Sequence, residues 1–215
     1  MSTTVMLMQL TKGLAVTAEI FLLTLLFSLP LGLLISFGRM AKNPIIRNLS
    51  KIYISIMRGT PLMLQLIVVY FAPFYVFGLK IPNYRFPAII IAFALNYAAY
   101  FAEIYRGGIE SMAVGQYEAA KVLGYNKTQT FFRIILPQVI KRILPSVTNE
   151  TITLVKDTSL AFVLAHAEMF TLAKQIAAKE TSIVPLMVAG VFYYIFNLIV
   201  ATAMEKLEKS MNYYR

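Results

Sequence analysis

Two pairs of polar side chains that can bind charge lie seven residues apart within apolar stretches of the chain. Glu150 and Asp157 form one pair, and Asn96 and Glu103 form the other. Seven residues make two turns of an α-helix, so each pair should project from one face of its helix. A charged side chain at the centre of a bilayer costs about 3 kcal/mol or more, so such residues commonly bind a ligand or an ion. Two helices that faced one another would therefore border a polar cavity.

Basic residues offer a structural role for two of these carboxylates. Glu103 precedes Arg106 by three residues, so the two side chains can form an ion pair on one helix face. Asp157 can neutralise a basic residue of its own segment or of another one, such as Arg58. Glu150 has no basic neighbour in the sequence, which makes it the strongest candidate for a ligand contact.

Residues typical of catalytic or metal centres are missing. The chain has no cysteine and one histidine, so thiolate sites and most imidazole metal sites are excluded. No nucleophile lies beside a general base, and neither a cofactor motif nor a phosphate-binding loop of the type Gly-x-x-x-x-Gly-Lys-Ser/Thr occurs. The sequence therefore predicts that the chain is not an enzyme and holds no metal or cofactor.

The elements that position these residues are long apolar helices. Hydrophobic residues make up 59% of the chain and charged residues 14%, a balance typical of membrane proteins rather than soluble domains. Several apolar runs approach the ~20 residues that cross a bilayer as a helix. We predict an all-α, polytopic membrane protein in which residues 1–215 form a single domain with five transmembrane helices. The predicted spans are Leu14–Phe37, Ile52–Phe77, Phe86–Tyr105, Val139–Ala165 and Ile183–Met204.

Lysine and arginine are unevenly divided between the loops that join these spans. Loops on the cytoplasmic side of a membrane carry the excess of positive charge. The sequence therefore predicts a protein of the cytoplasmic membrane, in contact with its lipids, with an external N-terminus and a cytoplasmic C-terminus. This distribution of basic residues accounts for the net charge of +10, so no nucleic acid partner is expected. With this orientation the outer side holds only Lys12, Lys80, Arg85, Lys174 and Lys179.

The longest polar stretch, residues 106–138, separates the third and fourth predicted spans and should lie in the cytoplasm. It is too long for a simple turn between neighbouring helices, so it should be structured. Alanine-rich residues predict a first helix that ends at Gly124, a residue suited to a left-handed C-terminal position. Asn126 or Thr128 can cap a second helix, which would lie along the membrane surface before Pro137 turns the chain. The two helices would form a short, rigid lever.

A fixed spacing of residues runs through this stretch. The sequence reads Glu118-Ala119-Ala120, then Gly124 after three residues, and Ile134, Leu136 and Pro137 after a further nine. This pattern resembles the cytoplasmic loop of the permeases in binding-protein-dependent ABC importers, and every fixed position matches. A helical hairpin that lies on the membrane surface without a partner is the alternative.

The resemblance extends over residues 10–210 and narrows to permeases for polar amino acids. One of the segments that carry it, at the end of the third predicted span, contains Gly107 and Gly108, which indicate either a hinge or a close contact between helices. The segments that carry the resemblance are Arg58-Gly59-Thr60-Pro61-Leu62 with Gln65, residues 100–109, and Lys156-Asp157-Thr158-Ser159-Leu160.

The resemblance implies several protein partners. Such permeases work in pairs, joined to two cytoplasmic ATPase subunits and an external amino-acid-binding protein. The sequence has no internal repeat, so we expect a second permease copy, with an identical chain favoured over a paralogue. The binding protein would dock near residues 80–85 and 168–181. Contact with the ATPase dimer is implied for Tyr117, Glu118, Ala119, Ala120 and Gly124.

The resemblance also implies a path for the substrate. An amino acid needs donors for its carboxylate, and a helix break at residues 59–61 would offer backbone amides. Permeases of the histidine and arginine type carry an Asn-Glu pair like Asn149-Glu150, which favours arginine, lysine or histidine as the substrate. The alternatives are glutamine or glutamate in the same class of importer, or an ion channel, which would give no reason for the cytoplasmic loop. The implied substrate-binding residues are Gly59, Thr60, Gln65, Asn96, Glu103, Glu150 and Asp157.

Overall fold

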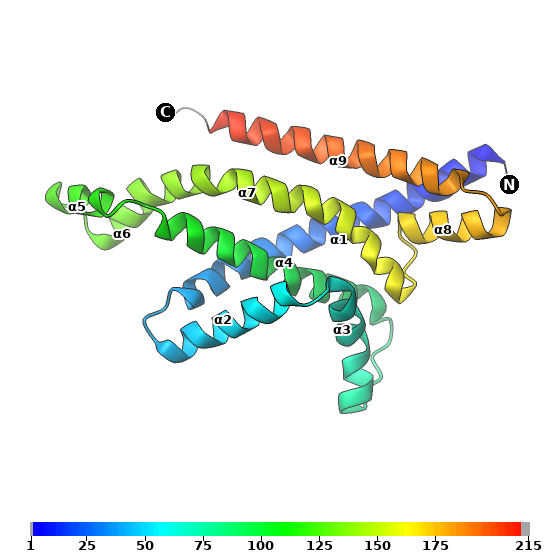
Figure 1. The fold of residues 1–215 in the computed structure, drawn as a ribbon, viewed down its shortest axis with the longest axis horizontal. Helices are drawn as coiled ribbons and strands as arrows, with labels where there is room; N and C mark the ends of the chain where they lie inside the picture. Colours follow the sequence, from blue (N-terminus) through cyan, green and yellow to red (C-terminus); the bar gives the residue numbers. More distant parts are fainter. Residues whose placement is uncertain (1, 212–215) are drawn as a thin grey trace.

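The computed structural model describes residues 2–211, and the regular elements within this range are all helices (Figure 1). The all-α prediction is confirmed, while Met1 and residues 212–215 of the predicted domain lie outside the described residues. In chain order the elements are α1 (Thr3–Arg39), α2 (Pro44–Gly59), α3 (Leu62–Phe77), α4 (Arg85–Glu110), α5 (Val114–Val122), α6 (Lys127–Gln129), the π-helical η1 (Thr130–Ile135), α7 (Leu136–Asp157), the 3₁₀ segment η2 (Thr158–Leu164), α8 (Met169–Glu180) and α9 (Val184–Ser210).

Helices α1 and α4 pack closely at the centre of the fold. Small residues on their facing sides let the two backbones approach. At Gly32 of α1, an added Cβ atom would lie 2.8 Å from Cβ of Phe101 and 3.0 Å from the carbonyl oxygen of Ala98. Ala98 and Ala102 of α4 are fully buried. This pair forms a rigid base on which α4 presents its polar side chains to the other helices.

The second predicted span is broken into α2 and α3. Their axes are bent by 112° at the break, and α3 projects from the body of the molecule (Figure 1). Pro61 has no N–H group to donate, and it favours the extended conformation that Thr60 adopts, with φ −121° and ψ 148°. The break expected at residues 59–61 is therefore confirmed. The first half of the pair begins at Pro44, well before the predicted start of the span at Ile52.

The helix that carries Glu150 and Asp157 is longer than the fourth predicted span. It runs from Lys127 through the π turn η1 and α7, and it ends as 3₁₀ helix at Leu164. The prediction that Pro137 turns the chain is wrong. In a regular α-helix the proline ring clashes with the carbonyl group four residues earlier. Here the wider π turn directly precedes Pro137 and displaces that carbonyl, so the helix continues.

Residues 168–181, predicted as an outer loop, form α8 and its caps. Glu168 begins the helix and accepts hydrogen bonds from the N–H groups of Phe170 (2.7 Å) and Thr171 (2.6 Å). The hydroxyl groups of Thr171 (2.8 Å) and Tyr193 of α9 (3.1 Å) also donate to it. Glu168 is fully buried, and α8 packs against α1 and α9. The loop prediction is wrong because this carboxylate caps a helix from inside the protein.

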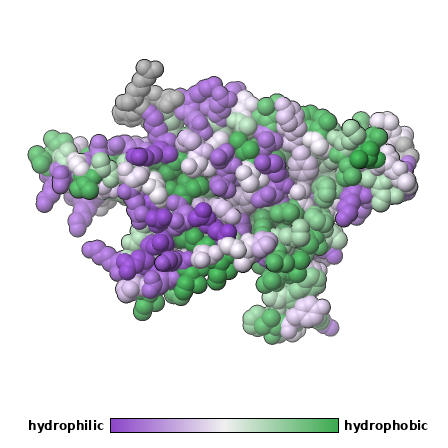
Figure 2. All heavy atoms as spheres, in the orientation of Figure 1, coloured by the Kyte–Doolittle hydropathy of each residue, from purple (hydrophilic) through white to green (hydrophobic). Residues whose placement is uncertain are grey.

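The number of membrane spans depends on the bent helix pairs. Helices α1, α4 and α9 are each long and apolar enough to cross a membrane, and they correspond to the first, third and fifth predicted spans. Counting each of the two bent pairs as one span raises the number to five. Figure 2 shows hydrophobic atoms gathered over α3 and hydrophilic atoms concentrated toward the end that holds α5 and α6.

Candidate functional site

The break between α2 and α3 brings three of the predicted site residues together. Gln65 Nε2 donates to the carbonyl oxygen of Met57 (2.9 Å) and to the carbonyl (3.1 Å) and hydroxyl (2.8 Å) oxygens of Thr60. Asn96 Nδ2 donates to the same Met57 carbonyl (3.0 Å) and to Oε1 of Gln65 (2.9 Å). Carbonyl groups in the last turn of a helix lack intrahelical partners, and these amides supply the missing donors. Gly59 lies beside this cluster and is exposed.

Asp157 is tied to α4 by a hydrogen bond. The hydroxyl group of the buried Tyr97 donates to its Oδ2 atom at 2.7 Å. Among residues 2–211 Asp157 forms no ion pair, and of the two basic residues considered for its neutralisation, Lys156 and Arg58, it is Lys156 that interacts with it electrostatically. Sequence reasoning missed Tyr97, although a buried tyrosine hydroxyl in an apolar helix needs a partner and is a usable signal. The Tyr97–Asp157 contact fixes α4 against α7.

Glu150 is the predicted carboxylate without a protein partner. It is half-buried, and it accepts no hydrogen bond and forms no ion pair within residues 2–211. Arg58 and Asp157 are the charged groups that interact with it electrostatically. The guanidinium group of Arg58 lies 5.2 Å from the ring centre of Tyr100 on α4. The acceptor oxygens of Glu150 are therefore free of protein partners within the described residues.

Glu103 belongs to a cluster of ion pairs near the end of α4. Arg106 donates two hydrogen bonds to it, at 2.6 Å and 3.1 Å, and Arg39 of α1 approaches to 3.7 Å. Arg106 also pairs with Glu110. The ion pair expected between Glu103 and Arg106 is present. Glu103 and Asn96 therefore contact different elements, α1 for the first and the α2–α3 break for the second.

The structure of the loop between α4 and α7 follows the predicted plan in part. Gly124 ends the first helix with a left-handed φ of +78°, and Asn126 forms a capping box with Gln129 at the start of α6. Ala120 is buried, so it does not face a partner directly. The remaining residues of the predicted ATPase contact are exposed, namely Tyr117, Glu118, Ala119 and Gly124.

Exposed apolar side chains lie at the two ends of α5, namely Val114 at its start and Val122 and Leu123 at its end; these three residues are called the α5 tip. Val114 is 70% exposed, Val122 87% and Leu123 73%. Figure 2 shows their end of the molecule as a hydrophobic patch beside hydrophilic atoms. These residues were not among those predicted to contact a partner, although aliphatic side chains on both sides of a polar motif are an available signal. Such a patch on a rigid, projecting segment is typical of a surface that binds another protein.

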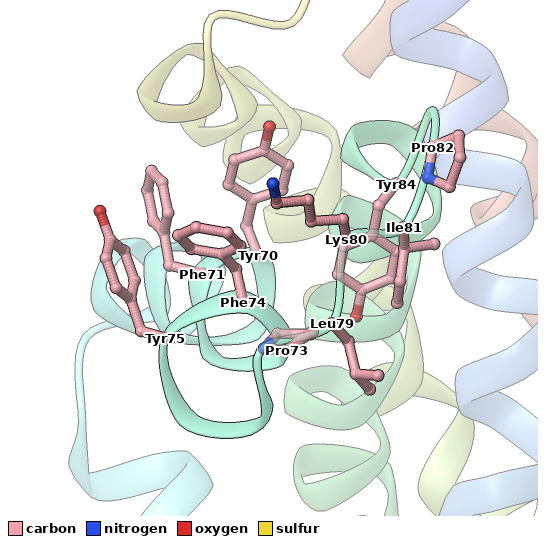
Figure 3. Close-up of a pocket in the computed structure, with 10 residues that line it drawn as sticks. All are labelled: Tyr70, Phe71, Pro73, Phe74, Tyr75, Leu79, Lys80, Ile81, Pro82 and Tyr84. Atoms are coloured by element: carbon pink, nitrogen blue, oxygen red, sulfur yellow. The ribbon is translucent and has the colours of Figure 1, made fainter.

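A pocket of about 420 Å³ opens at the free end of α3 (Figure 3). The rings of Tyr70 and Tyr84 are stacked at 6.3 Å, and Figure 3 shows Lys80 among the aromatic side chains that line the pocket. This pocket borders residues 80–85, where docking of a binding protein is expected.

No group of three or more His, Asp or Glu side chains within residues 2–211 could hold a metal ion.

Known proteins resemble this chain over nearly its whole length. Residues 28–213 match the family described as "Binding-protein-dependent transport system inner membrane component". The chain is 36% identical to the putative glutamine transport system permease protein of Rickettsia conorii, covering 93% of this chain and 91% of that protein. It is 35% identical to the arginine transport system permease protein of Bacillus subtilis, with the same coverage. A crystal structure of an amino acid ABC transporter with histidines superimposes with a TM-score of 0.85, at 31% identity and 94% coverage of each chain. The chain therefore belongs to the family of inner membrane components of binding-protein-dependent transport systems.

Proposed function

We propose that this chain is the permease subunit of an ABC importer for polar amino acids, and that its substrates are the basic ones, arginine, lysine and histidine. The observation that carries the charge preference is Glu150, a half-buried carboxylate to which the described protein offers no hydrogen bond or ion pair. A cation of the substrate would supply the missing partner. Relatives named for arginine and for glutamine transport support the class of importer but differ in substrate.

The remaining site residues divide into ligand contacts and supports. Asp157 borders the same path two turns from Glu150 and is held in place by Tyr97. Gly59 and Thr60 leave the backbone of the α2–α3 break open to the path, whereas Gln65 and Asn96 hold that break in shape. Glu103 stabilises the loop end of α4 through its arginine partners.

The proposed assembly contains two permease chains, two ATPase subunits and an external binding protein. The permease domain comprises residues 1–215, with its N-terminus outside and its C-terminus in the cytoplasm. The loop 106–138 is the coupling segment, and the exposed tip of α5 docks on the ATPase. ATP-driven closure of the ATPases moves this segment as a rigid body and opens the path to the outside, and hydrolysis resets it.

Uptake by proteoliposomes tests the substrate assignment. Vesicles with the permease, its ATPase and its binding protein should take up labelled arginine, and unlabelled lysine and histidine should compete while glutamine and glutamate should not. Glu150→Gln removes a charge-assisted contact worth about 2 kcal/mol, so uptake at low arginine should fall about tenfold or more. The exposed carboxylate of Glu205 provides a matched control, and Glu205→Gln should transport normally. Wild-type rates in both Glu150→Gln and Glu150→Ala would contradict the proposed role.

The coupling role of the α5 tip gives a second test. Leu123→Asp places a charge in the apolar patch and should weaken binding of the ATPase by about tenfold, as expected for the loss of a central apolar contact. Co-purification of the permease with the ATPase, and stimulation of ATP hydrolysis by loaded binding protein, measure the effect. Gln175→Asp, on the exposed face of α8 at the opposite end of the molecule, is the control (Figure 1). Full assembly and stimulation in Leu123→Asp would exclude this surface as the docking site.

A further inference from the structure

Arg58 and Glu150 are opposite charges that share one site without pairing. The two charges interact electrostatically, yet no ion pair joins them. Arg58 donates no hydrogen bond to any described residue, and its side chain is exposed. The nearest aromatic ring, Tyr100, lies under the guanidinium group at 5.2 Å from the ring centre and leaves its N–H donors free.

The packing of α4 against α7 shows where Arg58 lies along the helix axes relative to Glu150 and Asp157. The register of the two helices is set by the hydrogen bond from Tyr97 to Asp157. Tyr100 is three residues further along α4 toward the loop, about 4.5 Å, and Glu150 is seven residues along α7 in the same direction, about 10 Å. The guanidinium group above Tyr100 therefore lies between the levels of the two carboxylates.

Other acidic groups do not neutralise Arg58. Glu103 is the other carboxylate that interacts with it electrostatically, but Glu103 already holds Arg106 and Arg39. Asp157 is occupied by the Tyr97 hydroxyl. Arg58 also lies in the last turn of α2, where the helix dipole favours a cation and explains why one is tolerated there. The dipole leaves the five N–H donors of the guanidinium group without acceptors.

We propose that Arg58 binds the α-carboxylate of the transported amino acid while Glu150 binds its cationic side chain. A guanidinium group matches a carboxylate in a two-pronged geometry, which makes arginine well suited to this task. In a basic amino acid the carboxylate and the side-chain cation are separated by several bonds, so two protein charges that are too far apart for an ion pair fit the two ends. This assignment rests on the proposed function, and it adds a requirement for a free carboxylate on the ligand.

Equilibrium binding to the permease–ATPase complex in nanodiscs, without the binding protein, tests the assignment. The probes are labelled arginine, its amide, in which the carboxylate is neutral, and its decarboxylated form, agmatine. The wild-type complex should bind arginine about tenfold or more tightly than either analogue. Arg58→Gln should bind all three with similar, weak affinity. Lys51→Gln, an exposed cation on the same helix, is the control and should keep the wild-type preference.

The outcomes separate this inference from the proposed function. Equal binding of arginine and agmatine to the wild-type complex would overturn the role of Arg58 even if every variant failed to assemble. A wild-type preference that survives in Arg58→Gln would overturn it as well, and would assign Arg58 to a structural contact with Tyr100. If labelled arginine is taken up by the complete importer in either case, the proposed function stands. If none of the amino acids is taken up, the proposed function itself fails.

Discussion

Alanine in place of Gly108 should lower the free energy of unfolding by about 2 kcal/mol, although replacing glycine by alanine stabilises most helices. A Cβ atom at this position would lie 2.1 Å from Cγ2 of Ile143 and 3.3 Å from Cγ1 of Val139 on α7. Ile143 is branched at Cβ and has few rotamers available, so α4 and α7 would have to separate. Unfolding in mild detergent, followed by circular dichroism, measures the change.

Gly107 supplies the matched control for this contact. It is exposed, and no atom lies within 4 Å of an added Cβ, so Gly107→Ala should raise stability by about 0.5 kcal/mol through helix propensity. Combining Gly108→Ala with Ile143→Ala removes the clashing methyl group and should recover most of the loss. Equal stability of the two single glycine variants would contradict the close contact and favour a hinge at this glycine pair instead.

Removal of the Glu168 carboxylate should have the second large effect, a loss of about 3 kcal/mol or more. Glu168→Ala deletes the N-cap of α8, a change that commonly costs about 1 kcal/mol, and it leaves the buried donors of Thr171 and Tyr193 without their acceptor. Because α8 packs on α1 and α9, its N-terminal turn should loosen together with both contacts. Thermal unfolding and limited proteolysis between η2 and α8 measure this change.

Two further variants serve as comparisons for Glu168→Ala. Glu168→Gln keeps one carbonyl oxygen in place and should lose about half as much stability. Gln175→Ala changes an exposed residue of the same helix and should stay within about 0.5 kcal/mol of the wild type. A loss in Glu168→Ala no larger than that in Gln175→Ala would show that water or another group replaces the buried carboxylate.

The long apolar helices could be predicted from the sequence because membrane spans leave a composition signal. Helices α1, α4 and α9 each contain an apolar stretch of 18 residues that carries this signal. Helix α8 could not be recognised in the same way, since its twelve residues include Lys174, Lys179 and Glu180 and resemble a polar loop. Its start depends on Glu168, whose carboxylate is buried and contacts Tyr193 of the next helix, a packing that the local sequence does not reveal.

The spacing of the sequence predicted which polar residues share a helix face, but not which residues of other helices they contact. Helical spacing correctly placed polar groups along α4 and α7, and Pro61 marked the break that Gln65 and Asn96 hold. The partner of Asp157 depends on the register between α4 and α7, which packing sets and spacing along one helix cannot reveal. For this reason Tyr97 was overlooked, and Glu103 was grouped with Asn96 although the two contact different helices.

The direction in which the α5 tip points depends on the number of residues in the π turn η1. An α-helix turns by about 100° per residue, and a π turn absorbs roughly one residue more than an α turn. The direction of Leu123 relative to Glu150 is therefore set by how many residues stand between 130 and 135, whatever their side chains. Deleting one of them would convert the π turn into an α turn, rotate the preceding segment by about a quarter of a turn around the helix axis, and bring the ring of Pro137 against the carbonyl group four residues earlier. Under the docking proposed above, two permeases with identical docking residues would differ in the ATPase they fit.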